Sequence, residues 1–339
     1  MKEAMLYEVH DEQRVRCLLC AHYCMIENGR RGICQVRENR DGVLSTLVYG
    51  RTISQNVDPI EKKPLFHFHP GSRSFSIATP GCNFRCDWCQ NCEISQMPRE
   101  RHFIAGRKMS AQEIVDSAAR AHCCSIAYTY TEPTIFFEYT YDTSKLAREA
   151  GLANIYVSNG YMSAEMLEEF HPWLDAANID LKAFRDTTYR KHAGGGLQPV
   201  LDSMKRLRRY GIWLEVTTLI IPGINDSPGE LADIAGFIAG ELGPDTPWHV
   251  SRFFPQYRFD KLPPTPPETI FRAVEIGRGA GLRYIYPGNL PSGTDTCCPG
   301  CGALLIRRQG YELTENRVTA AGFCPDCETA IAGVGLAGC

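Results

Sequence analysis

Residues 79–91 read TPGCNFRCDWCQN and hold Cys82, Cys86 and Cys89 in one short loop with C-x3-C-x2-C spacing. A [4Fe–4S] cluster normally takes four cysteine ligands, so three thiolates from this loop would leave one iron open to an outside ligand. The alternative is a zinc loop in which Cys92 supplies the fourth thiolate. The loop therefore predicts a metal centre, and its spacing favours the cluster.

Strand-like and helix-like stretches alternate along the chain outward from this loop. Residues 73–79 predict a strand that ends at the loop, and further strands are expected at 125–131, 154–159, 177–182, 212–221, 248–253 and 282–286. Helices are expected between them, at about 110–122, 134–150, 199–210, 228–240 and 267–280, with one more that begins at Ser163. Ser110 and Glu113 predict a capping box at the first helix.

This alternation implies parallel strands that are joined by right-handed crossovers. We predict an α/β fold, a partial (βα)6 TIM-like barrel with an N-terminal Cys-rich cap and a C-terminal zinc-ribbon-like four-cysteine module. The expected divisions are residues 1–70, 71–290 and 291–339. In such barrels the active site lies at the carboxyl ends of the strands, which is where the Cys82 loop falls.

Polar residues follow several of the expected strands. Glu132 follows the second strand, Asn159 follows the third, and Asp180 and Lys182 belong to the fourth. Each also has a plainer interpretation. Asp180 and Lys182 could be only an ion pair at the barrel mouth, Asn159-Gly160 is a common turn dipeptide, and Glu132-Pro133 could simply begin a helix.

Taken together, these motifs resemble the radical SAM superfamily. Within it they resemble the pyruvate formate-lyase activating enzymes and, more closely, the AmmeMemoRadiSam system radical SAM enzymes. The resemblance rests on VDPIEKKPLFHFHPGS, TPGCNFRCDWCQN, TYTEPT, YVSNGY, NIDLKAF, IPGIND, HVSRFFP and YPGNLP, together with the cysteine groups near both ends of the chain. It covers nearly the whole chain.

The resemblance implies a [4Fe–4S] cluster on Cys82, Cys86 and Cys89, with S-adenosylmethionine chelating the open iron. Reductive cleavage of S-adenosylmethionine would release a 5′-deoxyadenosyl radical, which abstracts hydrogen from a substrate. Glu132 is expected to hold the turn that meets the methionine amino group, and Lys182 suits the methionine carboxylate. The expected contacts of S-adenosylmethionine are Trp88, Tyr130, Thr131, Glu132, Ser158, Asn159, Asp180, Lys182, Ile221 and Pro222.

Two further groups of four cysteines flank the barrel. Cys298, Cys301, Cys324 and Cys327 form two C-x2-C pairs, which favour a structural Zn²⁺ or Fe site in a small two-stranded ribbon with a Glu-Asn turn. Cys17, Cys20, Cys24 and Cys34 form a second set. Its spacing does not distinguish zinc from a second iron–sulfur cluster, and structural zinc is the favoured interpretation.

Composition sets the broad class of the protein. The chain has 339 residues, 44% of them hydrophobic, and its net charge of −3 excludes a wholly basic nucleic-acid binder. It begins MKEAMLYEVH, without the apolar region of a signal peptide, and has no apolar run long enough to span a membrane. We therefore expect a cytoplasmic protein, in which 16 cysteines point to metal ligands or redox chemistry rather than to a disulfide scaffold.

The sequence leaves the substrate open. A glycyl-radical-enzyme activase, an RNA-modifying enzyme and an enzyme acting on a small molecule all remain as candidates, and a non-catalytic iron–sulfur or zinc protein is the alternative from another class. The expected electron donor is a reductase, a flavodoxin or a ferredoxin. Memo-like and AMMECR-like proteins are candidate partners, which the family resemblance alone suggests.

Overall fold

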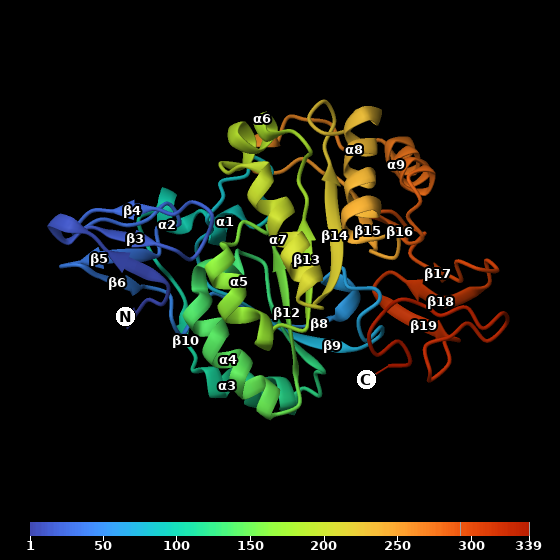
Figure 1. Ribbon diagram of the computed structural model, residues 1–339, viewed down its shortest axis with the longest axis horizontal. Coiled ribbons are helices and arrows are strands. Elements are labelled where there is room, and N and C mark those ends of the chain that lie inside the picture. The colour runs from blue at the N-terminus through green and yellow to red at the C-terminus, as the bar shows by residue number, and fades with distance from the viewer. Residues whose placement is uncertain (292, 339) are drawn as a thin grey trace.

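The structure is a computed structural model that describes residues 1–291 and 293–338. Its centre is an eight-stranded sheet with the order β16-β15-β14-β13-β12-β11-β9-β8 (Figure 1). The strands are β8 (Ser54–Pro59), β9 (Arg73–Ala78), β11 (Ser125–Tyr128), β12 (Ala153–Ser158), β13 (Ala176–Asp180), β14 (Trp213–Ile220), β15 (Trp248–Arg252) and β16 (Ile285–Gly288). All neighbours pair in parallel except β8 and β9, so the predicted partial parallel barrel is confirmed.

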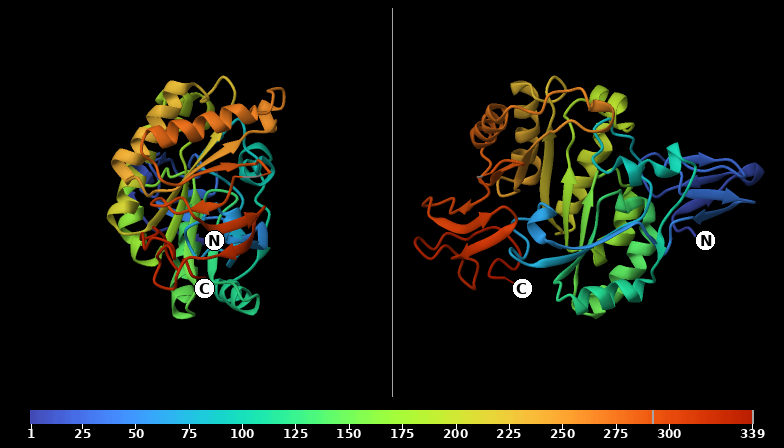
Figure 2. Two further views of the ribbon diagram at one scale, coloured as in Figure 1. Left: turned by 90° about the vertical axis from the view of Figure 1, so that its right-hand side faces the viewer. Right: turned by 180° about the vertical axis from the view of Figure 1, so that it is seen from behind.

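A helix connects each pair of consecutive parallel strands. These helices are α3 (Ala111–Arg120), α4 (Phe137–Glu149), α5 (Ala164–Phe170), α7 (Leu197–Arg209), α8 (Pro228–Phe237) and α9 (Pro267–Gly279). They cover one face of the sheet, which is seen from its other side in the right panel of Figure 2. Short helices α1 (Cys92–Ser95), α2 (Met97–Glu100) and α6 (Asp186–Thr188) lie in the loops.

Local sequence signals explain where several helices begin. The hydroxyl of Ser110 accepts from the Glu113 amide and the Glu113 carboxylate accepts from the Ser110 amide, which is the predicted capping box. The side chains of Ser163 and Ser227 cap α5 and α8 by accepting from the amides of Met166 and Glu230, without the reciprocal bond. The strands between these helices are almost wholly buried; all four residues of β11 are examples. A parallel sheet with one face under helices requires such apolar strands.

The N-terminal segment forms small antiparallel sheets beside the barrel. One contains β1 (Lys2–Glu3), β6 (Val43–Thr46) and β5 (Arg37–Arg40), and another contains β2 (Tyr7–Val9), β3 (Val15–Cys17) and β4 (Met25–Ile26). β7 (Arg51–Thr52) pairs with β10 (Arg107–Lys108). Because β8 joins the central sheet, that sheet begins before the boundary at residue 71 that the sequence suggested.

The C-terminal ribbon lies at the opposite end of the molecule from the N-terminal sheets (Figure 1). It has three strands rather than the expected two: β17 (Thr296–Cys297), β18 (Leu304–Gln309) and β19 (Glu312–Asn316). Its hairpin turns at Gly310, whose φ of 62° suits glycine, and not at Glu315-Asn316 as the sequence suggested. Its chain returns to the barrel, where Val334 bridges to Phe68.

Candidate functional site

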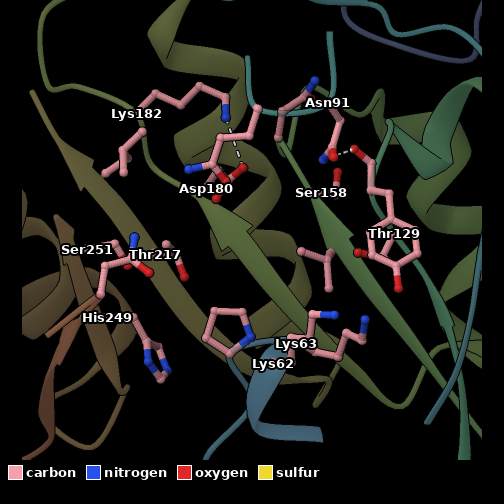
Figure 3. A pocket seen from close by; sticks show the side chains of 18 of the residues that line it. Lys62, Lys63, Asn91, Thr129, Ser158, Asp180, Lys182, Thr217, His249 and Ser251 are labelled. Carbon is pink, nitrogen blue, oxygen red and sulfur yellow. Dashed lines mark hydrogen bonds and ion pairs between the residues drawn. The ribbon is translucent and has the colours of Figure 1, made fainter. Parts of the chain in front are cut away.

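A cavity of about 790 Å³ opens at the carboxyl ends of the parallel strands. Its wall is built from the Cys82 loop, the turns after β11, β12 and β13, the inner faces of β14 and β15, and the loop after β16 (Figure 3). The C-terminal ribbon reaches it through Gly310 and Tyr311. This volume is within the range of small-molecule and cofactor sites.

The three thiols of the Cys82 loop all line this cavity. The loop is held in shape by its own hydrogen bonds: the Phe84 amide lies 3.3 Å from the sulfur of Cys82, and the sulfur of Cys89 lies 3.2 Å from the Ser95 hydroxyl. Burial raises the pKa of Cys82, and it raises that of Cys86 to about 12, against an opposing effect of Lys182. Binding of a metal centre would therefore displace protons from these thiols.

The turn after β11 is tied to the end of β12 by Glu132. This buried carboxylate accepts hydrogen bonds from the amide and hydroxyl of Thr134 at 3.0 and 2.6 Å, and from the Ser158 hydroxyl at 2.8 Å. It also accepts from the Asn159 amide at 2.8 Å. Burial raises the pKa of Glu132, and these donors oppose the shift. Glu132 therefore acts as a tie between two strand ends, which agrees with the expected structural role.

Tyr130 stands at the tip of the same turn with a φ of 63°. Its carbonyl oxygen accepts a hydrogen bond from the Asn91 side chain at 2.7 Å, and its hydroxyl donates to Asp58. The Thr131 hydroxyl donates to the Thr79 carbonyl at 2.8 Å, just before the Cys82 loop. The turn is thus fastened to both ends of the loop that carries the three cysteines.

Asp180 and Lys182 form an ion pair in the cavity wall, with 2.9 Å between Nζ and the carboxylate (Figure 3). Burial would lower the pKa of Lys182, but the Asp180 carboxylate and Cys86 outweigh it and hold the pKa above its usual value. Lys182 therefore stays charged beside the cysteine loop. The plain ion pair and a ligand-binding role are both compatible with this geometry, because the pair faces the cavity.

A row of side chains that begins at Asp180 crosses the inner face of the sheet. Strand register places Asp180, Thr217, His249 and Tyr286 next to one another on four adjacent strands, and all four line the cavity. The His249 ring lies 2.6 Å from the buried Glu215 carboxylate. That carboxylate also accepts three further hydrogen bonds, which fixes the orientation of the imidazole.

Lys62 and Lys63 extend the cavity wall at the end away from Asn91 and Lys182 (Figure 3). Lys63 is buried and donates to Asp58, whereas Lys62 is partly exposed and lies 2.9 Å from the same carboxylate. Burial lowers the pKa of Lys63 to about 8, and Asp58 opposes that shift. This part of the cavity can offer cationic and hydrogen-bonding groups to a second ligand.

Eight of the ten residues expected to contact S-adenosylmethionine line the cavity, and two do not. Trp88, Tyr130, Thr131, Glu132, Ser158, Asn159, Asp180 and Lys182 all line the cavity. Ile221 and Pro222 do not. Ile221 follows the end of β14 and is fully buried, whereas Leu219 on β14 lines the cavity. Cys92 begins α1 and is not part of the wall, so it is poorly placed as a fourth ligand in this cavity.

Several wall residues were not singled out from the sequence. Asn91, Lys62, Lys63, His249 and Ser251 are examples, although the segments that contain them were part of the resemblance. A usable signal exists for His249 and Ser251, because they alternate on one strand and therefore share a face. Asn91 and the lysines come from irregular segments, where no periodicity shows which side chains point inward.

The C-terminal cysteines form a compact set that could hold one metal ion. The sulfurs of Cys298, Cys301, Cys324 and Cys327 all lie within 4.8 Å of one another. Two sulfur pairs are separated by 3.5 and 3.8 Å, and the Gly300 amide lies 3.4 Å from the Cys298 sulfur. A tetrahedron of Zn–S bonds of about 2.3 Å puts its sulfurs about 3.8 Å apart, so the set fits a tetrahedral ion.

The N-terminal cysteines also converge. Cys17, Cys20, Cys24 and Cys34 line one small hollow, and the buried Arg37 lies beside them. Among residues 1–291 and 293–338, however, no three of these four sulfurs come within 4.8 Å of one another. This wider spacing sets them apart from the C-terminal set. In the same part of the chain, no helix is long and apolar enough to cross a bilayer.

Comparison with known proteins shows what this chain is similar to. The sequence profile of the radical SAM superfamily matches residues 76–235. Uncharacterized protein MJ0808 of Methanocaldococcus jannaschii is 48% identical over 310 residues, which are 91% of this chain and 92% of that protein. A pyruvate formate-lyase-activating enzyme of Clostridium pasteurianum is 23% identical over 175 residues, 50% of this chain and 70% of the relative.

Solved structures agree at the level of the fold. A radical SAM methyltransferase from Sphaerobacter thermophilus has a TM-score of 0.51 and 16% sequence identity, with 70% of this chain and 71% of that chain covered. At this identity the likeness concerns the fold, an α/β partial barrel. This likeness gives no information about the substrate.

Proposed function

Because the chain belongs to the radical SAM superfamily and is a radical SAM enzyme, we propose that its cavity binds a [4Fe–4S] cluster and S-adenosylmethionine together. Cys82, Cys86 and Cys89 are the proposed ligands of the cluster. The observation that carries this proposal is that the three thiols share one cavity wall with the Asp180–Lys182 ion pair. Three thiolates with a nearby cation and carboxylate suit a cluster that has one open iron and a zwitterionic ligand beside it.

In this proposal, different side chains bind different parts of S-adenosylmethionine. We assign Lys182 to the carboxylate of S-adenosylmethionine and Asp180 to its ribose hydroxyls, with Trp88 and Leu219 as apolar surfaces for the adenine. Glu132 keeps the turn at Tyr130 and Thr131 in place beside the methionine amino group. Ser158 and Asn159 support that turn from the next strand. Once reduced, the bound cluster and S-adenosylmethionine supply a 5′-deoxyadenosyl radical that can abstract hydrogen from a substrate.

We place the unidentified substrate at the part of the cavity away from the cysteine loop. His249, Ser251 and Thr217 offer hydrogen bonds there, and Lys62 offers a cation. Glu215 holds the His249 ring at 2.6 Å, so the imidazole can receive a polar group without reorienting. The role of these residues is to hold one carbon–hydrogen bond of the substrate toward the bound S-adenosylmethionine.

A second candidate function is activation of a glycyl-radical enzyme. It is supported by two relatives, the pyruvate formate-lyase-activating enzyme of Clostridium pasteurianum and a putative glycyl-radical enzyme activating enzyme of Methanocaldococcus jannaschii that is 25% identical over 223 residues. In that case the substrate is a glycine in a partner protein. Memo-like and AMMECR-like proteins, suggested by the AmmeMemoRadiSam resemblance, remain further proposed partners.

The other cofactors follow from the chemistry of the remaining groups. We propose Zn²⁺ for Cys298, Cys301, Cys324 and Cys327, because their sulfur spacing matches a Zn–S tetrahedron. A one-electron donor of the flavodoxin or ferredoxin class, or a reductase, is needed to reduce the cluster. We expect a reducing compartment such as the cytoplasm, since the proposed metal ligands must stay as thiols.

The test is anaerobic turnover without an added substrate. The protein is reconstituted with iron and sulfide, reduced with dithionite and given S-adenosylmethionine, and 5′-deoxyadenosine and methionine are measured. The proposal predicts both products in equal amounts, and their loss in a Cys82→Ala, Cys86→Ala, Cys89→Ala variant. A Cys123→Ser variant is the control, because this buried thiol lies outside the cavity. Fully clustered protein that neither cleaves nor binds S-adenosylmethionine would refute the proposal.

A further inference from the structure

Cys17, Cys20, Cys24 and Cys34 line one small hollow and come from separate turns of the N-terminal segment. Cys17 ends β3, Cys24 immediately precedes β4, and Cys34 lies in the turn that leads into β5. We propose that these four thiolates bind a second [4Fe–4S] cluster, fully coordinated by the protein. This inference does not depend on the substrate or on the S-adenosylmethionine site.

Sulfur spacing distinguishes a cluster from a single ion. Four thiolates on one Zn²⁺ lie about 3.8 Å apart, as the C-terminal set does. Within the described parts of the chain, no three sulfurs of the N-terminal set, and likewise not the sulfurs of Cys82, Cys86 and Cys89, come within 4.8 Å of one another. Thiolates that bind different irons of a cluster must stand farther apart than thiolates that share one ion. The spacing thus points away from the structural zinc that the sequence favoured.

A buried cation completes the site. Arg37 lines the hollow, is 1% exposed, and forms an ion pair with Glu138 at 2.7 Å. A [4Fe–4S]²⁺ cluster with four thiolates carries a net negative charge, and a buried guanidinium beside it lowers the cost of placing that charge away from water. His22 also lines the hollow, but its Nε2 is 2.9 Å from the Asn83 carbonyl oxygen, so that nitrogen is already in use.

The hollow adjoins the back of the loop that carries Cys82. A Cβ atom at Gly81 would lie 2.8 Å from Val36 Cγ1 and 3.4 Å from the Cys34 carbonyl oxygen, so glycine permits the close approach. Arg99, at the end of α2, donates to the Ile33 carbonyl at 2.9 Å. The two cysteine sites are therefore packed against each other through one layer of residues.

The decisive experiment uses the full-length Cys82→Ala, Cys86→Ala, Cys89→Ala variant after anaerobic reconstitution. Iron, acid-labile sulfide and zinc are counted per chain, and the reduced protein is examined by electron paramagnetic resonance. We expect about four sulfides per chain, and a reduced-cluster signal that added S-adenosylmethionine does not change. Sulfide separates a cluster from a mononuclear iron at the C-terminal set, which contains none.

If the triple variant does not fold, the same measurements on wild-type protein test the proposal. It should bind about eight sulfides per chain and show two reduced-cluster signals, of which only one responds to S-adenosylmethionine. A Cys20→Ser, Cys34→Ser variant should lose the unresponsive signal and keep the other, whereas Cys123→Ser should keep both. A sulfide-free triple variant that binds two zinc ions, or one with no metal at the N-terminal set, would overturn the proposal.

Discussion

The Lys182 ammonium lies in the cavity wall with a carboxylate on one side and the cysteine loop on the other. Asp180 is 38% exposed at its side chain, so it keeps room for a second hydrogen-bonding partner, whereas Lys182 is only 15% exposed. A lysine held this way is a fixed cation. It can attract a carboxylate into the cavity without a change in its own position.

Replacement of this cation tests its assigned role. Lys182→Met should weaken S-adenosylmethionine binding by at least about tenfold, which corresponds to about 1.4 kcal/mol, because the carboxylate loses a charged partner. Cluster content should not change, since Lys182 is not a ligand. Equilibrium binding to the reconstituted protein measures the effect, and Lys205→Met on α7, outside the cavity, is the control. An unchanged affinity would show that the ion pair is only structural.

Glu132 has a structural role, because its carboxylate accepts hydrogen bonds from four donors. In Glu132→Gln, the side-chain amide would direct N–H groups at one or more of these donors. We expect the free energy of unfolding to fall by about 1–3 kcal/mol. Thermal or denaturant unfolding measures this, with Glu149→Gln at the exposed end of α4 as the matched control. Equal stability of the two variants would contradict the role of Glu132 as a tie.

At the level of elements, the turn after β12 positions Asn159 beside the cysteine loop. Asn159 donates to the Asn83 side chain at 2.8 Å, and Gly160 follows with a φ of 71°. A Cβ atom at Gly160 would lie 2.7 Å from Ile179 Cγ2 and 3.2 Å from Val200 Cγ1. The turn dipeptide seen in the sequence therefore also marks a point of close packing between two strands and a helix.

Two glycines with the same backbone conformation allow the cost of steric overlap to be measured apart from the cost of backbone strain. Gly151 has a φ of 73° but open space around the position of a Cβ atom. Gly160→Ala should lower the free energy of unfolding by about 1–3 kcal/mol more than Gly151→Ala, because only the first adds overlap to the backbone strain. Denaturant unfolding of both variants is the measurement. A difference near zero would mean that Ile179 and Val200 move aside without cost.

Most of the barrel could be predicted from the sequence because each βα unit carries its own signals. Apolar strands, Ser110 and Ser163 at the starts of α3 and α5, and turn glycines predicted nearly all the strands of the central sheet and the helices between them. The antiparallel β8 was missed because SQNVDP is polar and half-exposed, without a strand pattern. The N-terminal strands have two to four residues, too few for a periodicity to appear.

The cavity residues were also predictable only where they belong to regular βα units. Residues that directly follow the parallel strands were predicted to lie together, because the carboxyl ends of parallel strands meet at one edge. The orientation of Ile221 depends on where β14 ends: its amide donates to Asn225 at 2.7 Å, and the chain turns away from the cavity there. Lys62 and Lys63 reach the cavity only through the antiparallel pairing of β8, which the sequence did not reveal.

In the whole molecule, the C-terminal ribbon is fastened to the barrel by Arg308. Its guanidinium donates to the carbonyl oxygens of Phe66 and Thr294 at 2.8 and 2.9 Å, and it lies 3.6 Å from the buried carboxylate of Glu61. The side chain of Arg308 is fully buried. It connects the ribbon to a segment that lines the cavity, so the ribbon helps to shape the site.

Loss of this anchor should loosen the ribbon. Arg308→Met leaves Glu61 without its cation, and we expect the free energy of unfolding to fall by about 3 kcal/mol or more. Amide hydrogen exchange should also increase across β18 and β19. Arg307→Met, whose exposed side chain pairs with Glu315, serves as the control and should change little. Unaltered exchange in the Arg308 variant would show that the metal site alone holds the ribbon.

The central claim is that S-adenosylmethionine binds the open iron of a cluster held by Cys82, Cys86 and Cys89 in this cavity. The most direct measurement is electron–nuclear double resonance on the reduced protein with S-adenosylmethionine labelled with ¹⁵N at the amino group or ¹⁷O at the carboxylate. Hyperfine coupling of both labels to the cluster is predicted in wild-type protein and its absence in the triple Cys→Ala variant. Fully clustered wild-type protein without either coupling would contradict the account.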